Sequence, residues 1–148
     1  MRLAGFNYST PAIYYITVCT QNREPILWTS ETINISVGNS ERQILKPELS
    51  ETGLITEEFV RQIPGLEKYV IMPNHVHMII RIREKGETPV TSRIRTFKTF
   101  VTREVGENIW QRSFYDEILR TDKCRRYIEI CTYIDENPIN WIIDEYHN

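Results

Sequence analysis

The spacing of hydrophobic residues divides the chain into strand and helix segments. Alternating or continuously apolar runs predict strands over residues 12–20, 69–72, 75–83 and 114–119. Helical spacing predicts helices over residues 54–63, beginning near Thr56, over 90–105, and over 122–137, where Pro138 ends the last one. This order predicts an α+β fold of the ferredoxin-like, split βαβ type, an antiparallel sheet backed by helices with an extra C-terminal helix.

A polar segment separates the first strand from the first helix. Residues 21–50 contain two short β-like pieces, over 32–37 and 43–45, with a Gly-Asn-Ser turn between them, and no functional motif. A chain of 148 residues is long enough to bury one core, so we predict a single domain over residues 1–148.

Composition narrows the class of protein. A hydrophobic content of 41% with 26% charged residues excludes a disordered, collagen-like or coiled-coil chain. No apolar run approaches the ~18 residues of a membrane span, and no signal-peptide core follows Met1. The three cysteines lack Cys-x-x-Cys spacing. We therefore expect a cytoplasmic protein that does not contact a membrane.

Charge is distributed unevenly along the chain. The net charge of −2 argues against indiscriminate binding to nucleic acid. Residues 81–126, however, contain twelve Lys and Arg against seven Asp and Glu, a net charge of +5, and the rest of the chain has −7. One region of the protein is therefore suited to an anionic partner.

Two histidines form the first candidate site. His75 and His77 are two residues apart on a predicted strand, so their side chains share one face with Cβ atoms about 6 to 7 Å apart. That spacing allows both imidazoles to bind one metal ion if a third ligand is supplied. The alternative is a pair of partly exposed sheet histidines without a ligand.

The last predicted helix contains a second candidate. A buried stripe is expected at Cys124, Tyr127, Ile128, Cys131 and Ile134, which places Tyr133 about 160° away, grouped with Asn137. A tyrosine there is either a surface aromatic or a nucleophile. A phenol has a pKa near 10, so it attacks a phosphodiester usefully only with help from a metal ion and basic groups.

Several segments, in order along nearly the whole chain, resemble a known family. Residues 70–80, VIMPNHVHMII, resemble the histidine-hydrophobic-histidine (HUH) segment of single-tyrosine transposases, in the branch associated with REP palindromes. Further agreement occurs over residues 2–8, 15–20, 53–55, 109–116 and 133–138. The HUH segment together with the Tyr-Ile-x-x-Asn-Pro segment is far more specific than either alone.

The resemblance implies a transposase that nicks and rejoins single-stranded DNA beside hairpins such as REP-like palindromes, as a monomer or homodimer. It implies Mg²⁺ or Mn²⁺ as cofactor, with His75 and His77 as metal ligands. It also implies that Tyr133, on the extra helix, becomes joined to the DNA 5′ phosphate and that Asn137 is the third metal ligand. Related insertion-sequence transposases have Gln where this chain has Asn137.

Basic and aromatic residues provide candidates for DNA contacts. The basic side chains are expected to bind phosphates, about a third of them in practice: Arg81, Arg83, Arg93, Arg95, Lys98, Arg112, Arg120 and Arg126. Trp110, Phe114 and Tyr115 are candidates for stacking on unpaired bases, with core packing expected for at least one of them.

Two other functions remain open. A catalytically inactive or domesticated module would bind DNA hairpins without cutting them. A small metal-dependent hydrolase acting on nucleotides would turn over substrate without a covalent adduct. Detection of a protein–DNA adduct separates both from the transposase interpretation.

Overall fold

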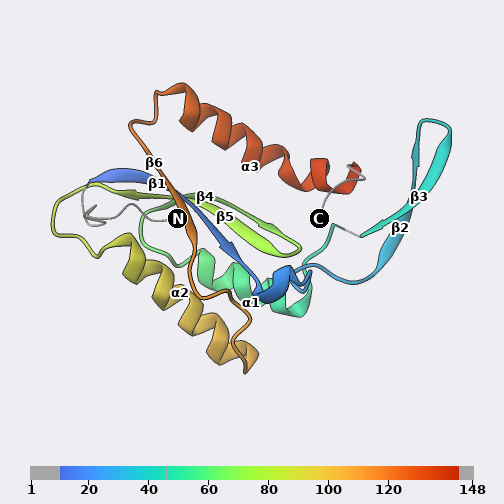
Figure 1. Ribbon diagram of the computed structural model, residues 1–148, viewed down its shortest axis with the longest axis horizontal. Helices are drawn as coiled ribbons and strands as arrows, with labels where there is room; N and C mark the ends of the chain where they lie inside the picture. Colours follow the sequence, from blue (N-terminus) through green and yellow to red (C-terminus); the bar gives the residue numbers. More distant parts are fainter. Residues whose placement is uncertain (1–10, 46, 144–148) are drawn as a thin grey trace.

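The computed structural model of the chain describes residues 11–45 and 47–143 (Figure 1). The elements in chain order are β1 (Ala12–Cys19), the short 3-10 helix η1 (Gln21–Arg23), β2 (Thr32–Val37), β3 (Ser40–Leu45), α1 (Glu51–Val60), β4 (Leu66–Met72), β5 (His75–Ile82), α2 (Val90–Val105), β6 (Tyr115–Leu119) and α3 (Arg125–Ile143). Over these described ranges, none of the helices combines the length and the apolar character needed to cross a membrane.

The main sheet has the strand order β4-β5-β1-β6, and every neighbouring pair is antiparallel. A tight turn joins β4 to β5, whereas the connections that contain α1 and α2 link strands that are not neighbours. This arrangement is the ferredoxin-like split βαβ topology. The predicted fold class is therefore confirmed.

Helices cover both faces of the sheet. Figure 1 shows α1 and α2 on one face and α3 on the other. Because successive strand residues point to opposite faces, β1 and β5 contribute Ile16 and Met78 to a core beneath α1 and α2, and Ile13 and Ile79 to a second core beneath α3. The candidate histidines belong to the face covered by α3, since they alternate with the residues of the first core.

Helix α1 begins at Glu51, so the prediction of a start near Thr56 is wrong. Ser50 caps the helix, because its Oγ accepts a hydrogen bond from the Gly53 amide at 3.0 Å. Gly53 weakens the helical signal in the sequence, but a Cβ there would lie 2.0 Å from the carbonyl oxygen of Leu27. The glycine is needed for this close packing of α1 on the backbone.

Other boundaries also differ from the prediction: α1 ends at Val60 rather than at residue 63, β3 begins at Ser40 rather than at 43, and α3 begins at Arg125 rather than at 122. Helix α3 continues to Ile143, through Pro138, because proline removes one helical hydrogen bond but has a helical φ angle. Strand β4 begins at Leu66 rather than at residue 69, and a register shift between Leu66 and Lys68 interrupts the alternation that would have revealed it.

The segment between β1 and α1 forms a separate hairpin. Strands β2 and β3 pair with each other, as the two predicted β-like pieces suggest, and the hairpin extends away from the main sheet (Figure 1). Trp28, which is buried, attaches the preceding segment to the sheet through a hydrogen bond of 2.9 Å from its Nε1 to the carbonyl of Ile71.

Candidate functional site

His75 and His77 lie side by side at the start of β5, directly after the turn at Pro73 and Asn74. Their Nε2 atoms are 3.1 Å apart, and their ring centroids are 4.6 Å apart. His77 is buried, with 7% of its surface exposed. The prediction that the two imidazoles share one face is confirmed.

Each histidine has a partner at its other ring nitrogen. Nδ1 of His75 is 2.6 Å from Oδ1 of Asn74, and Nδ1 of His77 is 3.0 Å from the Tyr15 hydroxyl and 2.9 Å from that of Thr17. When Nδ1 carries the proton and donates to these oxygens, the lone pair of each ring lies on Nε2. The two lone pairs then lie on atoms 3.1 Å apart, a separation that one metal ion can bridge.

The environment keeps both imidazoles neutral at physiological pH. Burial lowers the pKa of His75 to about 4, with a smaller contribution from the Arg23 charge. Burial also lowers the pKa of His77 to about 3, and the neighbouring His75 adds to the effect. Neutral imidazole is the form that binds metal ions.

Tyr133 lies beside the histidines, at the margin of the buried face of α3. The predicted stripe is wrong in part, because Ile128 is 57% exposed while Ile130 is buried. This shifts the buried face toward Tyr133, whose ring meets that of His77 edge to face at 5.5 Å between centroids. The side chain is 48% exposed, so its hydroxyl can reach a bound substrate.

Asn137 follows Tyr133 by about one helical turn and is buried. Its Nδ2 atom has no hydrogen-bond partner among the described residues. Tyr127 hydrogen-bonds to Glu67 of β4, which lies beside the C-terminal end of β5, whereas Tyr133 packs on His77 near the N-terminal end of β5. Helix α3 therefore runs antiparallel to β5, toward His75, and brings Asn137 to the histidine end of the strand.

These residues are chemically suited to a divalent ion. Two nitrogens about 2.1 Å from one ion and at right angles to each other would lie about 3 Å apart, close to the 3.1 Å between the two Nε2 atoms. The buried atom of Asn137 that lacks a partner is Nδ2, a hydrogen-bond donor, which suits an acceptor such as a phosphate oxygen, whereas a metal ion would bind the amide oxygen. Within the described ranges, no three His, Cys, Asp or Glu side chains form a metal cluster, so a third protein ligand from these ranges would be of another type.

Three residues that support the histidines escaped the sequence-based prediction: Tyr15, Thr17 and Asn74. Tyr15 and Thr17 share a face of β1 by their spacing, but the register that pairs Thr17 with His77 is a long-range property. The ring of Tyr15 also stacks on His77 at 5.5 Å. Burial, followed by the nearby Tyr133, raises the pKa of Tyr15 to about 12.

Arg93 is a structural residue, contrary to its prediction as a DNA contact. Its side chain is only 4% exposed and forms an ion pair with Glu87 at 3.0 Å. Its guanidinium also donates to the carbonyls of Pro64, at 2.7 Å, and Thr88, at 2.9 Å. A positive charge in the sequence does not distinguish this buried role from an exposed one.

Arg93→Met is expected to lower the free energy of unfolding by about 3 kcal/mol, because the carbonyls of Pro64 and Thr88 and the partly exposed carboxylate of Glu87 lose their donor. The measurement is urea denaturation followed by circular dichroism. Arg95→Met, an exposed change on the same helix, is the control and should alter stability by less than about 0.5 kcal/mol. Equal stabilities of the two variants would contradict the structural role of Arg93.

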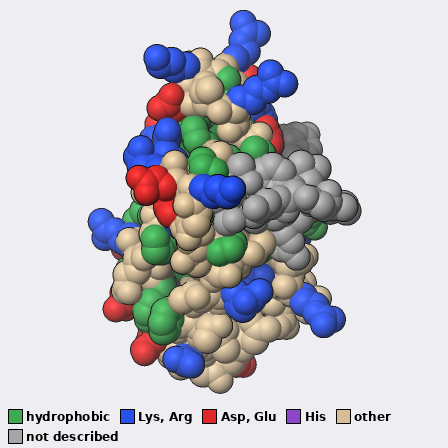
Figure 2. Space-filling view, turned by 90° about the vertical axis from the view of Figure 1, so that its left-hand side faces the viewer, with side chains coloured by type: hydrophobic (Ala, Val, Ile, Leu, Met, Phe, Trp, Pro, Cys, Tyr) green, Lys and Arg blue, Asp and Glu red, His purple; other side chains and the backbone are tan. Residues whose placement is uncertain are grey.

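Four other predicted DNA contacts lie along β5, β6 and the start of α3. Arg81 pairs with Glu67 at 2.6 Å and with Asp122 at 3.2 Å, and Arg126 pairs with Glu117 at 2.7 Å. Arg83, whose side chain is 70% exposed, and Arg120 line a shallow pocket with Arg81. Figure 2 shows Lys and Arg side chains spread over one face of the molecule, several of them beside Asp or Glu.

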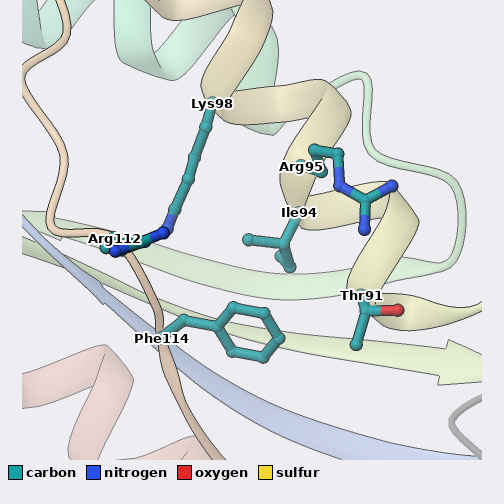
Figure 3. A pocket seen from close by; sticks show the side chains of 6 residues that line it. All are labelled: Thr91, Ile94, Arg95, Lys98, Arg112 and Phe114. Carbon is teal, nitrogen blue, oxygen red and sulfur yellow. The ribbon is translucent and has the colours of Figure 1, made fainter.

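The remaining three predicted contacts converge on a groove between α2 and the segment before β6. The groove has a volume of about 350 Å³ and is lined by Thr91, Ile94, Arg95, Lys98, Arg112 and Phe114 (Figure 3). The amine of Lys98 donates to the carbonyls of Gln111, at 2.9 Å, and Ser113, at 3.1 Å, which flank Arg112. Among the aromatic candidates, Trp110 and Phe114 are buried in the core, and Tyr115 is 53% exposed.

Comparison with known proteins places the chain in a family. No family model matches it. An uncharacterised protein of Haemophilus influenzae is 30% identical over 98% of this chain and 90% of its own length. A REP-associated tyrosine transposase of Escherichia coli is 31% identical over 52% of this chain and 47% of its own length.

The fold has a solved counterpart. A structure of a REP-associated tyrosine transposase bound to a REP hairpin superposes with a TM-score of 0.65, at 22% identity, over 95% of this chain and 74% of that one. The structural similarity shows that the two proteins share a fold. The similarity in sequence is to the Haemophilus and Escherichia coli proteins. The chain therefore belongs to one family with the Haemophilus protein, and it resembles the REP-associated tyrosine transposases in sequence and shares their fold.

Proposed function

We propose that the chain is a metal-dependent enzyme of DNA transposition that nicks single-stranded DNA beside a hairpin and rejoins strands through a 5′-phosphotyrosine on Tyr133. The observation that carries this proposal is the contact between Tyr133 and the histidine pair, with 5.5 Å between the ring centroids of Tyr133 and His77. The names of the Escherichia coli relative and of the solved structure support a DNA hairpin, such as a REP-like palindrome, as the substrate.

The Tyr133 hydroxyl would be the nucleophile. Its oxygen forms a bond to phosphorus while the bond from phosphorus to the 3′ oxygen of the preceding nucleotide breaks. The phenol proton passes to solvent, and the departing 3′ oxygen takes up a proton. The 5′ phosphate stays on Tyr133, so attack by a 3′ hydroxyl reverses the step and joins strands without a nucleoside triphosphate.

His75, His77 and Asn137 would hold Mg²⁺ or Mn²⁺. When bound, the ion supplies positive charge that polarises the scissile phosphate and offsets charge in the transition state. An amide oxygen suits either ion, whereas imidazole favours transition metals, so we expect Mn²⁺ to bind more tightly than Mg²⁺. Tyr133 and His77 belong to one chain, which supports cleavage in cis by a single copy.

The test of this proposal is the detection of a covalent adduct. The protein is incubated with end-labelled single-stranded DNA that contains a palindromic hairpin, with Mn²⁺ or with EDTA, and the products are separated on a denaturing gel. We expect a band shifted by the mass of the protein with Mn²⁺ and its loss with EDTA. Cleavage without an adduct would point to a hydrolase instead.

A hairpin-binding module without cleavage is the second candidate. It is favoured by one observation: in residues 11–45 and 47–143, no third His, Cys, Asp or Glu joins His75 and His77. A site completed only by an amide binds a divalent ion less tightly than one with a carboxylate. Tight hairpin binding with no adduct at any Mn²⁺ or Mg²⁺ concentration would establish this alternative.

A further inference from the structure

Tyr115 is an exposed aromatic residue in line with the histidine site. It is the first residue of β6, which forms one edge of the main sheet. The register pairs Thr17 with His77 on one side and with Tyr115 on the other. Residues directly opposite each other in antiparallel strands point to the same face, so the three side chains form one row on the face covered by α3.

The row has the dimensions of a nucleotide-binding surface. Two strand spacings separate the backbones of His77 and Tyr115, about 10 Å in all. Tyr115 is 53% exposed and lies on β6, the strand that ends the sheet among the described residues, where a strand of DNA can approach. An exposed tyrosine offers a ring on which an unpaired base can stack, whatever its sequence.

The basic groove lies on the other side of the same edge. Phe114, which lines the groove, packs in the core beneath α1 and α2, whereas Tyr115 points to the opposite face. Arg112 lies only three residues before Tyr115, and Figure 3 shows Lys98 extending from α2 toward Arg112, while Arg95, also on α2, lines the other side of the groove. The described residues that line the groove include no Asp or Glu, which suits it to phosphates.

We propose that the groove and Tyr115 form one track for the unpaired DNA that flanks the hairpin. Arg95 and Arg112 bind its phosphates, and the Lys98 ammonium, held on the carbonyls of Gln111 and Ser113, adds positive charge to the groove. Tyr115 stacks a base so that the adjoining phosphate lies beside His77 and Tyr133. This inference rests on the proposed function, because it assigns a path to the strand that Tyr133 would cut. In this proposal the groove and Tyr115 bind the unpaired flank, and other residues bind the paired stem of the hairpin.

The test compares two fluorescein-labelled DNA probes by anisotropy, in EDTA so that no cleavage occurs. One is a hairpin with unpaired flanks on both sides of the stem, and the other is the same stem and loop without flanks. Tyr115→Ala should weaken binding of the flanked hairpin about 5- to 150-fold and leave the bare hairpin unchanged. Tyr115→Phe, which keeps the ring, should bind both probes like the wild type.

Control variants test whether the effect is specific to the Tyr115 ring and to the basic residues of the groove. Phe100→Ala removes another exposed aromatic ring, on α2, and should not affect either probe. Arg112→Ala should reduce the salt dependence of flanked-hairpin binding by about one unit in the log–log slope, whereas Arg103→Ala, outside the groove, should not.

The outcomes separate the track from the proposed function. If the wild type binds the flanked hairpin and Tyr115→Ala binds it equally well, the track is wrong and the proposed function stands. Equal losses for both probes in Tyr115→Ala would also overturn the track. If the wild type binds neither probe, the proposed function and the track are both wrong.

Discussion

Replacement of Tyr133 by phenylalanine is expected to lower the yield of covalent protein–DNA adduct by at least about three orders of magnitude, because the oxygen that forms the ester is removed. The Tyr133 ring contacts His77 edge to face and is half exposed, so phenylalanine preserves the packing and the stability. The measurement is the adduct fraction on a denaturing gel after incubation with labelled hairpin DNA and Mn²⁺. Hairpin affinity, measured on the same protein, should remain that of the wild type.

Tyr127→Phe is the matched control for this prediction, because Tyr127 lies on the same helix. Its hydroxyl donates to Glu67 at 3.2 Å, away from the histidines. Burial, followed by the contacts with Cys131 and Glu67, raises its pKa to about 12, which makes it a poor nucleophile. Adduct formation should therefore survive in Tyr127→Phe, and an adduct that persists in Tyr133→Phe would show that another residue is the nucleophile.

Much of the fold follows from local hydrophobic patterns. The bounds of α2 are those predicted, because its apolar stripe is regular and strongly amphipathic. The alternation of residue types predicts strand β5. Its residues Val76 and Met78 face the core beneath α1 and α2, whereas His77 and Ile79 face α3. The start of α1 was missed because Gly53 lowers helix propensity for the sake of a tertiary contact with Leu27. Local patterns do not contain that contact.

The candidate site was predictable only where its residues are close in sequence. The spacing of His75 and His77 was sufficient to place both on one face. Their support by Tyr15 and Thr17 depends on the pairing of β1 with β5, which the sequence does not specify. Likewise, Arg93 and Arg95 are arginines two residues apart on α2, but tertiary packing buries the side chain of Arg93 and leaves that of Arg95 exposed.

Helix α3 connects the packing of the fold to the chemistry of the site. Its buried face, with Ile130 and Ile134, fixes the helix on the sheet. Because Tyr133 and Asn137 lie along this face and its margin, the same packing determines where both residues sit relative to the histidines. A change in the register of α3 would therefore displace the nucleophile and the proposed third ligand together.

His77→Ala is expected to lower adduct formation about 1,000-fold or more, because loss of a metal ligand removes several kcal/mol of transition-state stabilisation. The change also leaves the hydroxyls of Tyr15 and Thr17 without their imidazole partner, at a cost of about 1 to 3 kcal/mol in stability. The measurements are the adduct yield as a function of Mn²⁺ concentration, Mn²⁺ binding by electron paramagnetic resonance, and the melting temperature.

Thr17→Val distinguishes the positioning of His77 from metal ligation itself. Valine has nearly the shape of threonine but removes the Oγ1 atom that lies 2.9 Å from Nδ1 of His77. Loss of such a supporting partner is expected to weaken Mn²⁺ binding about 10- to 100-fold. Adduct formation in Thr17→Val should therefore recover as Mn²⁺ is raised, whereas in His77→Ala it should not recover at any concentration. Equal Mn²⁺ affinity in the wild type and both variants would mean that His77 does not bind the metal ion.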